Sequence, residues 1–141
     1  MQNKHFIIFT DGGARGNPGP AGIGAVIYDG VETESKIIAE ISEYIGETTN
    51  NQAEYQAVVA AITKAKELGG EELDFYLDSE LVVEQLNRRY KVKNEGLAPL
   101  FLKVYNASLG FKKVSFTHIR REKNKYADLL VNKAIDLNII T

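Results

Sequence analysis

A glycine- and proline-rich stretch that follows a short apolar run constrains this chain more than any other feature. The run at residues 5–9 is typical of a buried strand. Residues 12–24 then hold six of the twelve glycines and two of the three prolines. Glycine permits positive φ and close backbone approach, and proline fixes φ, so this composition predicts a sharply shaped turn. Asp11 stands where the strand gives way to that turn. The core would desolvate its carboxylate unless a cation neutralised it, although Asp-Gly is also a common turn pair.

The rest of the chain predicts an alternation of strands and helices. Further strands are expected at residues 23–28, 36–45, 73–78 and 114–119, with a hairpin turn at Asp29-Gly30. The first helix is expected to begin in the polar segment 46–54 and to stop at Gly69-Gly70. Two more helices are expected at 79–86 and 97–109, and a last one after the charged loop at 120–125. Pro99 fits only the first turn of its helix. The order βββαβααβα predicts an α/β sheet of mixed strand direction that begins as an antiparallel meander, in one domain over residues 1–141.

Composition excludes several kinds of protein. The chain has no cysteine, which rules out disulfides and thiolate metal sites and fits a reducing cytoplasm, our expected location. The N-terminus shows no signal-peptide pattern, and no apolar run approaches the ~20 residues that span a bilayer, so we expect no membrane association. The net charge of −2 gives no global attraction for nucleic acid. Any such binding has to come from a local basic patch or from bound cations.

Acidic residues recur at element ends that face the predicted core. Glu54 lies on the helical face that continues through residues 58, 61, 62, 65 and 68. Asp78 ends an apolar strand just as Asp11 does, and Asp128 borders the apolar stripe of the last helix. Each has a structural alternative, since acids near helix N-termini are favoured by the macrodipole and Asp is a common N-cap.

These four carboxylates share a predicted geometry. If the strands ending in Asp11 and Asp78 are parallel neighbours, both acids reach one sheet edge, where open α/β sheets bind ligands. Helices that start near this edge would add Glu54 and Asp128. Several partly buried carboxylates repel one another unless cations join them, and Mg²⁺ prefers oxygen ligands. Two such ions about 3.5–4 Å apart form a clamp for in-line phosphoryl displacement. The pattern therefore predicts a Mg²⁺ site.

The motifs resemble type 1 ribonuclease H along essentially the whole chain. The matching segments are Thr10-Asp11-Gly12-Gly13, Gly16-Asn17-Pro18-Gly19-Pro20, Thr49-Asn50-Asn51-Gln52-Ala53-Glu54, Asp78-Ser79 and Asn124-Lys125-Tyr126-Ala127-Asp128. The resemblance implies the ribonuclease H-like fold, with a five-stranded mixed sheet of three antiparallel strands and then βαβ-type units, flanked by helices. It also implies an endonuclease that cuts the RNA strand of RNA–DNA hybrids to leave 5′-phosphate and 3′-hydroxyl ends. Asp11, Glu54, Asp78 and Asp128 would hold two Mg²⁺ ions, with Mn²⁺ as a possible substitute.

The resemblance also suggests residues that contact the hybrid. Recognition of the RNA 2′-hydroxyl needs neutral donor–acceptor groups, which Asn17, Asn50, Asn51 and Gln52 supply. The three asparagines match family positions that contact substrate, and turn or cap chemistry is compatible with that use. Thr49 and Asn94 match positions that hold a DNA phosphate, while Glu47 stands where some relatives carry a basic residue.

The loop before Asp128 and the segment that follows the second predicted helix, at 79–86, depart from the family pattern. His118 fits either an auxiliary catalytic residue or an ordinary strand-end residue, and Arg120 or Arg121 could bind a substrate phosphate. Many relatives carry a tryptophan-bearing basic extension after the second helix, but this chain has no tryptophan and only the short segment 87–94 at that place. Arg88, Arg89 and two lysines in that segment could bind a phosphate backbone or form a solvated loop. We expect weaker, salt-sensitive hybrid binding than in relatives with the extension.

Three functional hypotheses remain open at this point. The first is an active, metal-dependent ribonuclease H, expected to be monomeric with no obligate protein partner. The second is a catalytically silent nucleic-acid-binding module on the same fold, and the third is a ribonuclease H domain of a reverse transcriptase. A pure binder gains nothing from a repulsive acid cluster, which favours activity. The start at Met1 just before the first strand favours a free-standing enzyme.

Overall fold

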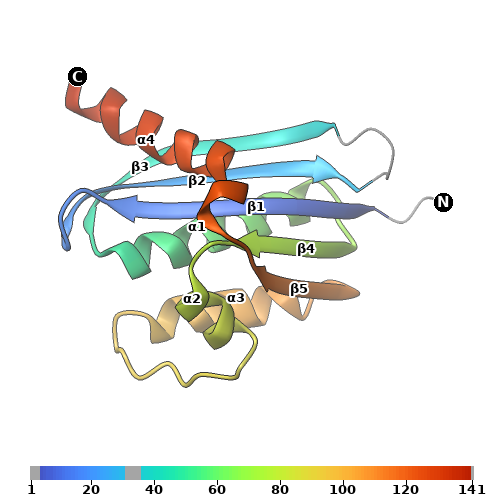
Figure 1. Ribbon diagram of the computed structural model, residues 1–141. Helices are drawn as coiled ribbons and strands as arrows, with labels where there is room; N and C mark the ends of the chain where they lie inside the picture. Colours follow the sequence, from blue (N-terminus) through green and yellow to red (C-terminus); the bar gives the residue numbers. More distant parts are fainter. Residues whose placement is uncertain (1–3, 31–35, 141) are drawn as a thin grey trace.

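The computed structural model describes residues 4–30 and 36–140 and shows one five-stranded sheet in the order β3-β2-β1-β4-β5. The strands are β1 (His5–Ala14), β2 (Gly19–Asp29), β3 (Ile37–Thr48), β4 (Glu72–Leu77) and β5 (Lys113–His118). The first three strands pair antiparallel, as the meander predicts, and β4 and β5 continue the sheet in parallel with β1. The predicted mixed sheet is therefore confirmed (Figure 1).

Helices cover both faces of this sheet. They are α1 (Asn50–Glu67), α2 (Glu80–Leu86), α3 (Ala98–Ser108) and α4 (Lys125–Ile140), with a 3-10 turn at Arg121–Lys123 inside the predicted charged loop. The helix α1 packs on β1 and β2 from one side, and α4 crosses β2 and β3 on the other (Figure 1). No helix within the described part of the chain is long and apolar enough to cross a membrane.

The main core lies between the sheet and α1. Alternate residues of β1 and β4, such as Ile8 and Phe75, point to this side and are fully buried, as the period of two along a strand requires. The helix α1 packs against them with a buried stripe of residues that includes Val58 and Ile62. Tyr55 places its ring in the same core and its hydroxyl donates to Gln85 Oε1 at 2.7 Å, which ties α1 to α2.

The predicted turn over residues 12–24 is wrong in extent, because both strands run into it and leave only residues 15–18 between them. Gly16, with a φ of 107°, serves the turn itself, whereas Gly12, Gly22 and Gly24 serve helix packing. A Cβ on Gly24 would lie 2.9 Å from Leu130 Cβ, so the α4 backbone can approach β2 only over glycine. The predicted hairpin at Asp29-Gly30 leads into residues 31–35, which lie outside the described residues, and Asp29 N donates to Lys36 O at 2.9 Å across it.

Helix starts follow the capping chemistry in the sequence. Thr49 caps α1 in a reciprocal box with Gln52, and Ser79, not Asp78, caps α2 by accepting from Val82 N at 3.3 Å. Pro99 falls in the first turn of α3, as predicted. Because a cap other than Asp78 is present, the carboxylate that follows β4 is free for another role.

Candidate metal centre

Three of the four predicted acids converge at one edge of the sheet. Each of Asp11, Glu54 and Asp78 offers a carboxylate oxygen, and these atoms all lie within 4.8 Å of one another. Parallel pairing of Thr10 with Leu77 places the residues that follow them side by side. The helix α1 brings in Glu54 from its second turn. The predicted meeting of Asp11 and Asp78 is thus present in the structure, although β1 does not end at Asp11 as predicted but continues to Ala14, and only its pairing with β4 stops at Thr10.

Gly12 allows α1 to come close enough for this convergence. Its backbone N–H donates to Glu54 Oε1 at 2.5 Å and to Asp11 Oδ1 at 3.0 Å. A Cβ at this position would lie 2.5 Å from the Glu54 backbone nitrogen, so any side chain would push the helix away. The glycine therefore fixes the distance between the first two carboxylates.

Burial makes these two carboxyl groups unusually weak acids. Desolvation, with added repulsion from Asp78 and Asp128, raises the pKa of Asp11 to about 7. Burial and the adjacent Asp11 raise the pKa of Glu54 well above its usual range, although the Gly12 N–H opposes that change. Without a cation, this pair therefore holds a proton up to a higher pH than ordinary carboxyl groups do. Hard divalent cations prefer oxygen ligands, and a bound cation would offset the desolvation and repulsion of these carboxylates. The site therefore fits a hard divalent cation.

Asn124 positions the third carboxylate. Its side chain is 1% exposed, and its Nδ2 donates both to Asp78 Oδ2 at 3.0 Å and to Thr10 O at 2.8 Å. The residue thereby joins β1, the carboxylate after β4 and the start of α4. The sequence shows Asn124 only as part of the last acid motif and gives no sign of this bridging geometry.

Asp128 lies outside the 4.8 Å group but lines the same pocket, whose volume is about 570 Å³. Its negative charge contributes to the raised pKa of Asp11, so the two carboxylates are within electrostatic reach. Arg15 and Arg121 supply positive charge to the pocket lining. Sequence reasoning missed Arg15, whose guanidinium pairs with Asp136 at 2.7 Å, because nothing in the turn composition indicates where that side chain points.

Predicted amide residues border the pocket beside the acids. Asn50 and Asn51 line it, and Asn17 Oδ1 accepts from Asn50 N at 3.0 Å, which docks the β1–β2 loop on the start of α1. Ala14 N completes that contact by donating to Asn50 Oδ1 at 2.7 Å. A row of neutral donor–acceptor groups therefore extends from the carboxylates along the N-terminal end of α1.

Thr49 and Asn94, the residues predicted to hold a phosphate, both lie next to Gln52 at the start of α1. Thr49 and Gln52 are joined by the capping box, and Asn94 Oδ1 accepts from Gly96 N at 2.7 Å. A Cβ built on Gly96 would lie 2.8 Å from Gln52 Nε2, so the loop that carries Asn94 rests against the start of α1. The structure thus brings these predicted residues together.

Comparison with known proteins identifies the family. The "Reverse transcriptase-like" family profile matches residues 9–134. Bifunctional protein Rv2228c of Mycobacterium tuberculosis is 42% identical over 92% of this chain, which spans 35% of that protein's length. RNase H1 of Halobacterium salinarum superposes with a TM-score of 0.89 at 37% identity, covering 94% of this chain and 98% of that chain. LC11-RNase H1, isolated from compost, superposes in its RNA/DNA hybrid complex with a TM-score of 0.88 at 45% identity, covering 95% and 99%.

The chain belongs to the type 1 ribonuclease H family. Its sheet order and helices are those of the ribonuclease H-like fold that the motifs predict. The chain covers 63% of the H. salinarum ribonuclease HI sequence as well as about a third of the mycobacterial protein. Family membership accordingly establishes the fold of this chain.

His118 lies apart from the acid pocket of this ribonuclease H family member. It ends β5 opposite Leu77, is exposed, and lines a neighbouring hollow of about 490 Å³ together with Glu84 and Arg89. It is not among the described residues that line the acid pocket. Its role in catalysis stays a prediction.

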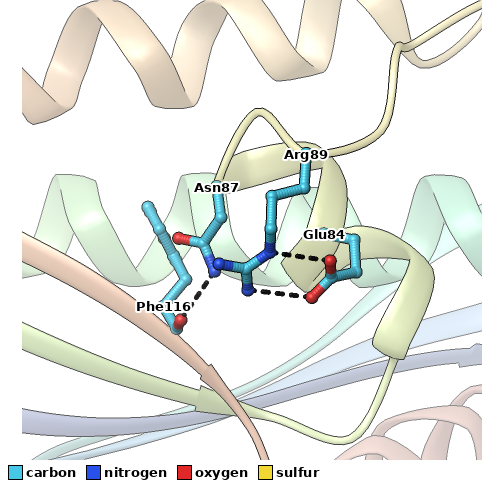
Figure 2. A network of polar contacts seen from close by, with 4 residues as sticks. All are labelled: Glu84, Asn87, Arg89 and Phe116. Carbon is cyan, nitrogen blue, oxygen red and sulfur yellow. Dashed lines mark hydrogen bonds and ion pairs between the residues drawn. The ribbon is translucent and has the colours of Figure 1, made fainter.

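The predicted basic segment is held by contacts of its own. Arg89 forms an ion pair with Glu84, and Asn87 Nδ2 donates to Phe116 O at 3.0 Å (Figure 2). Arg88 has a φ of 61° and lies over the Tyr105 ring, 5.7 Å from its centroid. The arginines that sequence reasoning assigns to the substrate therefore also hold the loop after α2.

Proposed function

We propose that this chain is a ribonuclease H that hydrolyses the RNA strand of RNA–DNA hybrids and leaves 5′-phosphate and 3′-hydroxyl ends. The convergence of Asp11, Glu54 and Asp78 within 4.8 Å carries this proposal. The related LC11-RNase H1, 45% identical, has been solved in complex with an RNA/DNA hybrid, which supports the substrate class. We further propose that the chain acts as a single domain and a monomer in the cytoplasm.

We propose that the acid cluster holds two Mg²⁺ ions, with Mn²⁺ as a possible substitute, and that Asp11, Glu54, Asp78 and Asp128 are the ligands. Such ions, when bound, supply an activated water and neutralise charge on the phosphate during in-line displacement. The chain's own contribution is to hold the carboxylates in place. Gly12 N–H orients Glu54, and Asn124 fixes Asp78, so neither side chain has to reorganise when a cation arrives.

Substrate recognition is proposed for the amide row and its neighbours. Asn17, Asn50 and Asn51 would contact the 2′-hydroxyl groups that distinguish RNA from DNA, with Gln52 beside them. Thr49 and Asn94 would hold a phosphate of the DNA strand. Arg121 lines the acid pocket, so it is better placed than the other candidate, Arg120, to contact a phosphate of the RNA strand. His118 is proposed only as an auxiliary group.

A silent binding module on this fold is the main competing function. A protein that only bound nucleic acid would have no use for buried carboxylates whose pKa values are raised by desolvation and, to a lesser degree, by the neighbouring acids. A reverse-transcriptase domain would share the same chemistry and differ in what it is attached to.

The test is cleavage of three end-labelled duplexes, an RNA–DNA hybrid, an RNA duplex and a DNA duplex, each with Mg²⁺, Mn²⁺ or EDTA. We expect cleavage of the RNA strand of the hybrid with either metal and none in EDTA. Hybrid binding without metal-dependent cleavage would support the silent module instead.

A further inference from the structure

The ion pair between Glu84 and Arg89 closes the loop that follows α2. Arg89 Nε donates to Glu84 Oε2 at 2.8 Å and Nη2 donates to Oε1 at 2.9 Å, so the guanidinium and carboxylate meet edge to edge (Figure 2). Arg89 N also donates to the Glu84 backbone carbonyl at 2.9 Å. Side chain and backbone therefore hold Arg89 against the same residue.

This pair removes one positive charge from the predicted basic segment. The guanidinium beside Glu84 lowers the pKa of that carboxyl, and the carboxylate raises the pKa of Arg89, so both groups stay charged at all ordinary pH values. Glu84 is 19% exposed in its side chain and Arg89 60%, which places the pair at the surface where a phosphate could reach it. The Nε–Nη2 edge that would take a phosphate in two hydrogen bonds is already occupied.

We propose that Glu84 limits the affinity of this chain for its hybrid substrate by holding Arg89 in an internal ion pair. The inference rests on the proposed function, since it assumes that the segment 88–93 faces the hybrid backbone. A cation contributes to binding and to salt dependence by replacing counterions on a phosphate. Arg89 with its own carboxylate has no net charge to offer, whereas Lys91 and Lys93 do.

The test measures hybrid affinity against KCl concentration by fluorescence anisotropy, in the Asp78→Asn background so that the RNA strand stays intact. Each phosphate contact adds about 0.9 to the slope of log affinity against log salt. Glu84→Gln should steepen the slope by about 0.9 and tighten binding about 3- to 10-fold at 0.1 M KCl. Glu84→Gln/Arg89→Ala should return both values to those of the parent.

Two further variants keep the proposal falsifiable if Glu84→Gln folds poorly, as judged by thermal unfolding. Arg89→Ala alone should leave the slope unchanged, while Lys91→Ala should reduce it by about 0.9. Glu67→Gln is the matched control. It removes the same charge and releases Lys64 from an ion pair near the C-terminal end of α1, outside the segment 88–93.

A slope that Glu84→Gln does not change, or that Arg89→Ala alone reduces by about 0.9, would overturn the proposal. An equal effect of Glu67→Gln would overturn it too, by showing that net charge suffices. Failure of the proposed function would show separately, as absence of metal-dependent hybrid cleavage by the unsubstituted chain.

Discussion

Removal of the Asp11 carboxylate should stabilise the metal-free protein at neutral pH. Its pKa rises from 3.8 to about 7 on folding. At pH values between these two, the folded state therefore binds more protons than the unfolded state. Stability is therefore unaffected by this group below pH 4, falls as the pH climbs toward 7, and stays reduced above it. Asp11→Asn keeps the oxygen that accepts from Gly12 N and removes the charge.

The size of this gain follows from the change in pKa. A tenfold change in an acidity constant is worth about 1.4 kcal/mol, so the full displacement corresponds to about 4 kcal/mol as an upper limit. Because the Glu54 carboxyl remains and adjusts its own protonation, we expect about 1–3 kcal/mol at pH 8, or a rise in Tm of roughly 3–10 °C.

Thermal unfolding followed by circular dichroism in EDTA at pH 4.5 and pH 8 measures this effect. The difference between Asp11→Asn and the parent should be small at pH 4.5 and large at pH 8, and MgCl₂ should stabilise the parent more than the variant. Asp136→Asn, at an exposed position, is the control and should change stability by less than about 0.5–1 kcal/mol. A variant no more stable than the parent at pH 8 would refute the electrostatic reasoning.

Three other perturbations test separate parts of the account. Asp78→Asn should reduce Mg²⁺-dependent hybrid cleavage at least about 100-fold while leaving the circular dichroism spectrum unchanged, and full activity would defeat the metal assignment. Gly12→Ala should cost about 1–3 kcal/mol or more in urea unfolding because its Cβ would meet the Glu54 backbone, whereas Gly13→Ala, whose Cβ would lie 3.7 Å from Val131 Cγ1, should cost much less. His118→Ala should lower kcat about 10-fold if the imidazole assists proton transfer, and an unchanged kcat would leave it a strand-end residue.

Local chemistry in the sequence was sufficient to predict the element order. Short apolar runs mark β1 and β4, and the helix caps and stops mark the ends of α1. The parallel pairing of the apolar segments that lead to Asp11 and Asp78 then follows from fold class. For that reason the convergence of Asp11 and Asp78 could be predicted before any coordinate was known.

Features that depend on distant contacts could not be predicted in the same way. Gly12 and Gly24 read locally as turn residues, yet they lie in strands because α1 and α4 pack directly on their backbones. The bridging role of Asn124 depends on atoms of Thr10 and Asp78, more than forty positions away along the chain. Likewise, the partner that neutralises Arg89 is visible only once α2 and its following loop are folded.

The most direct test of the central claim is anomalous diffraction from crystals of the protein grown with Mn²⁺. The account predicts an ion bound by oxygen atoms of Asp11, Glu54 and Asp78, whose carboxylates already lie within 4.8 Å of one another. Saturating Mn²⁺ that leaves these carboxylates without an ion, or that binds only elsewhere on the surface, would contradict it.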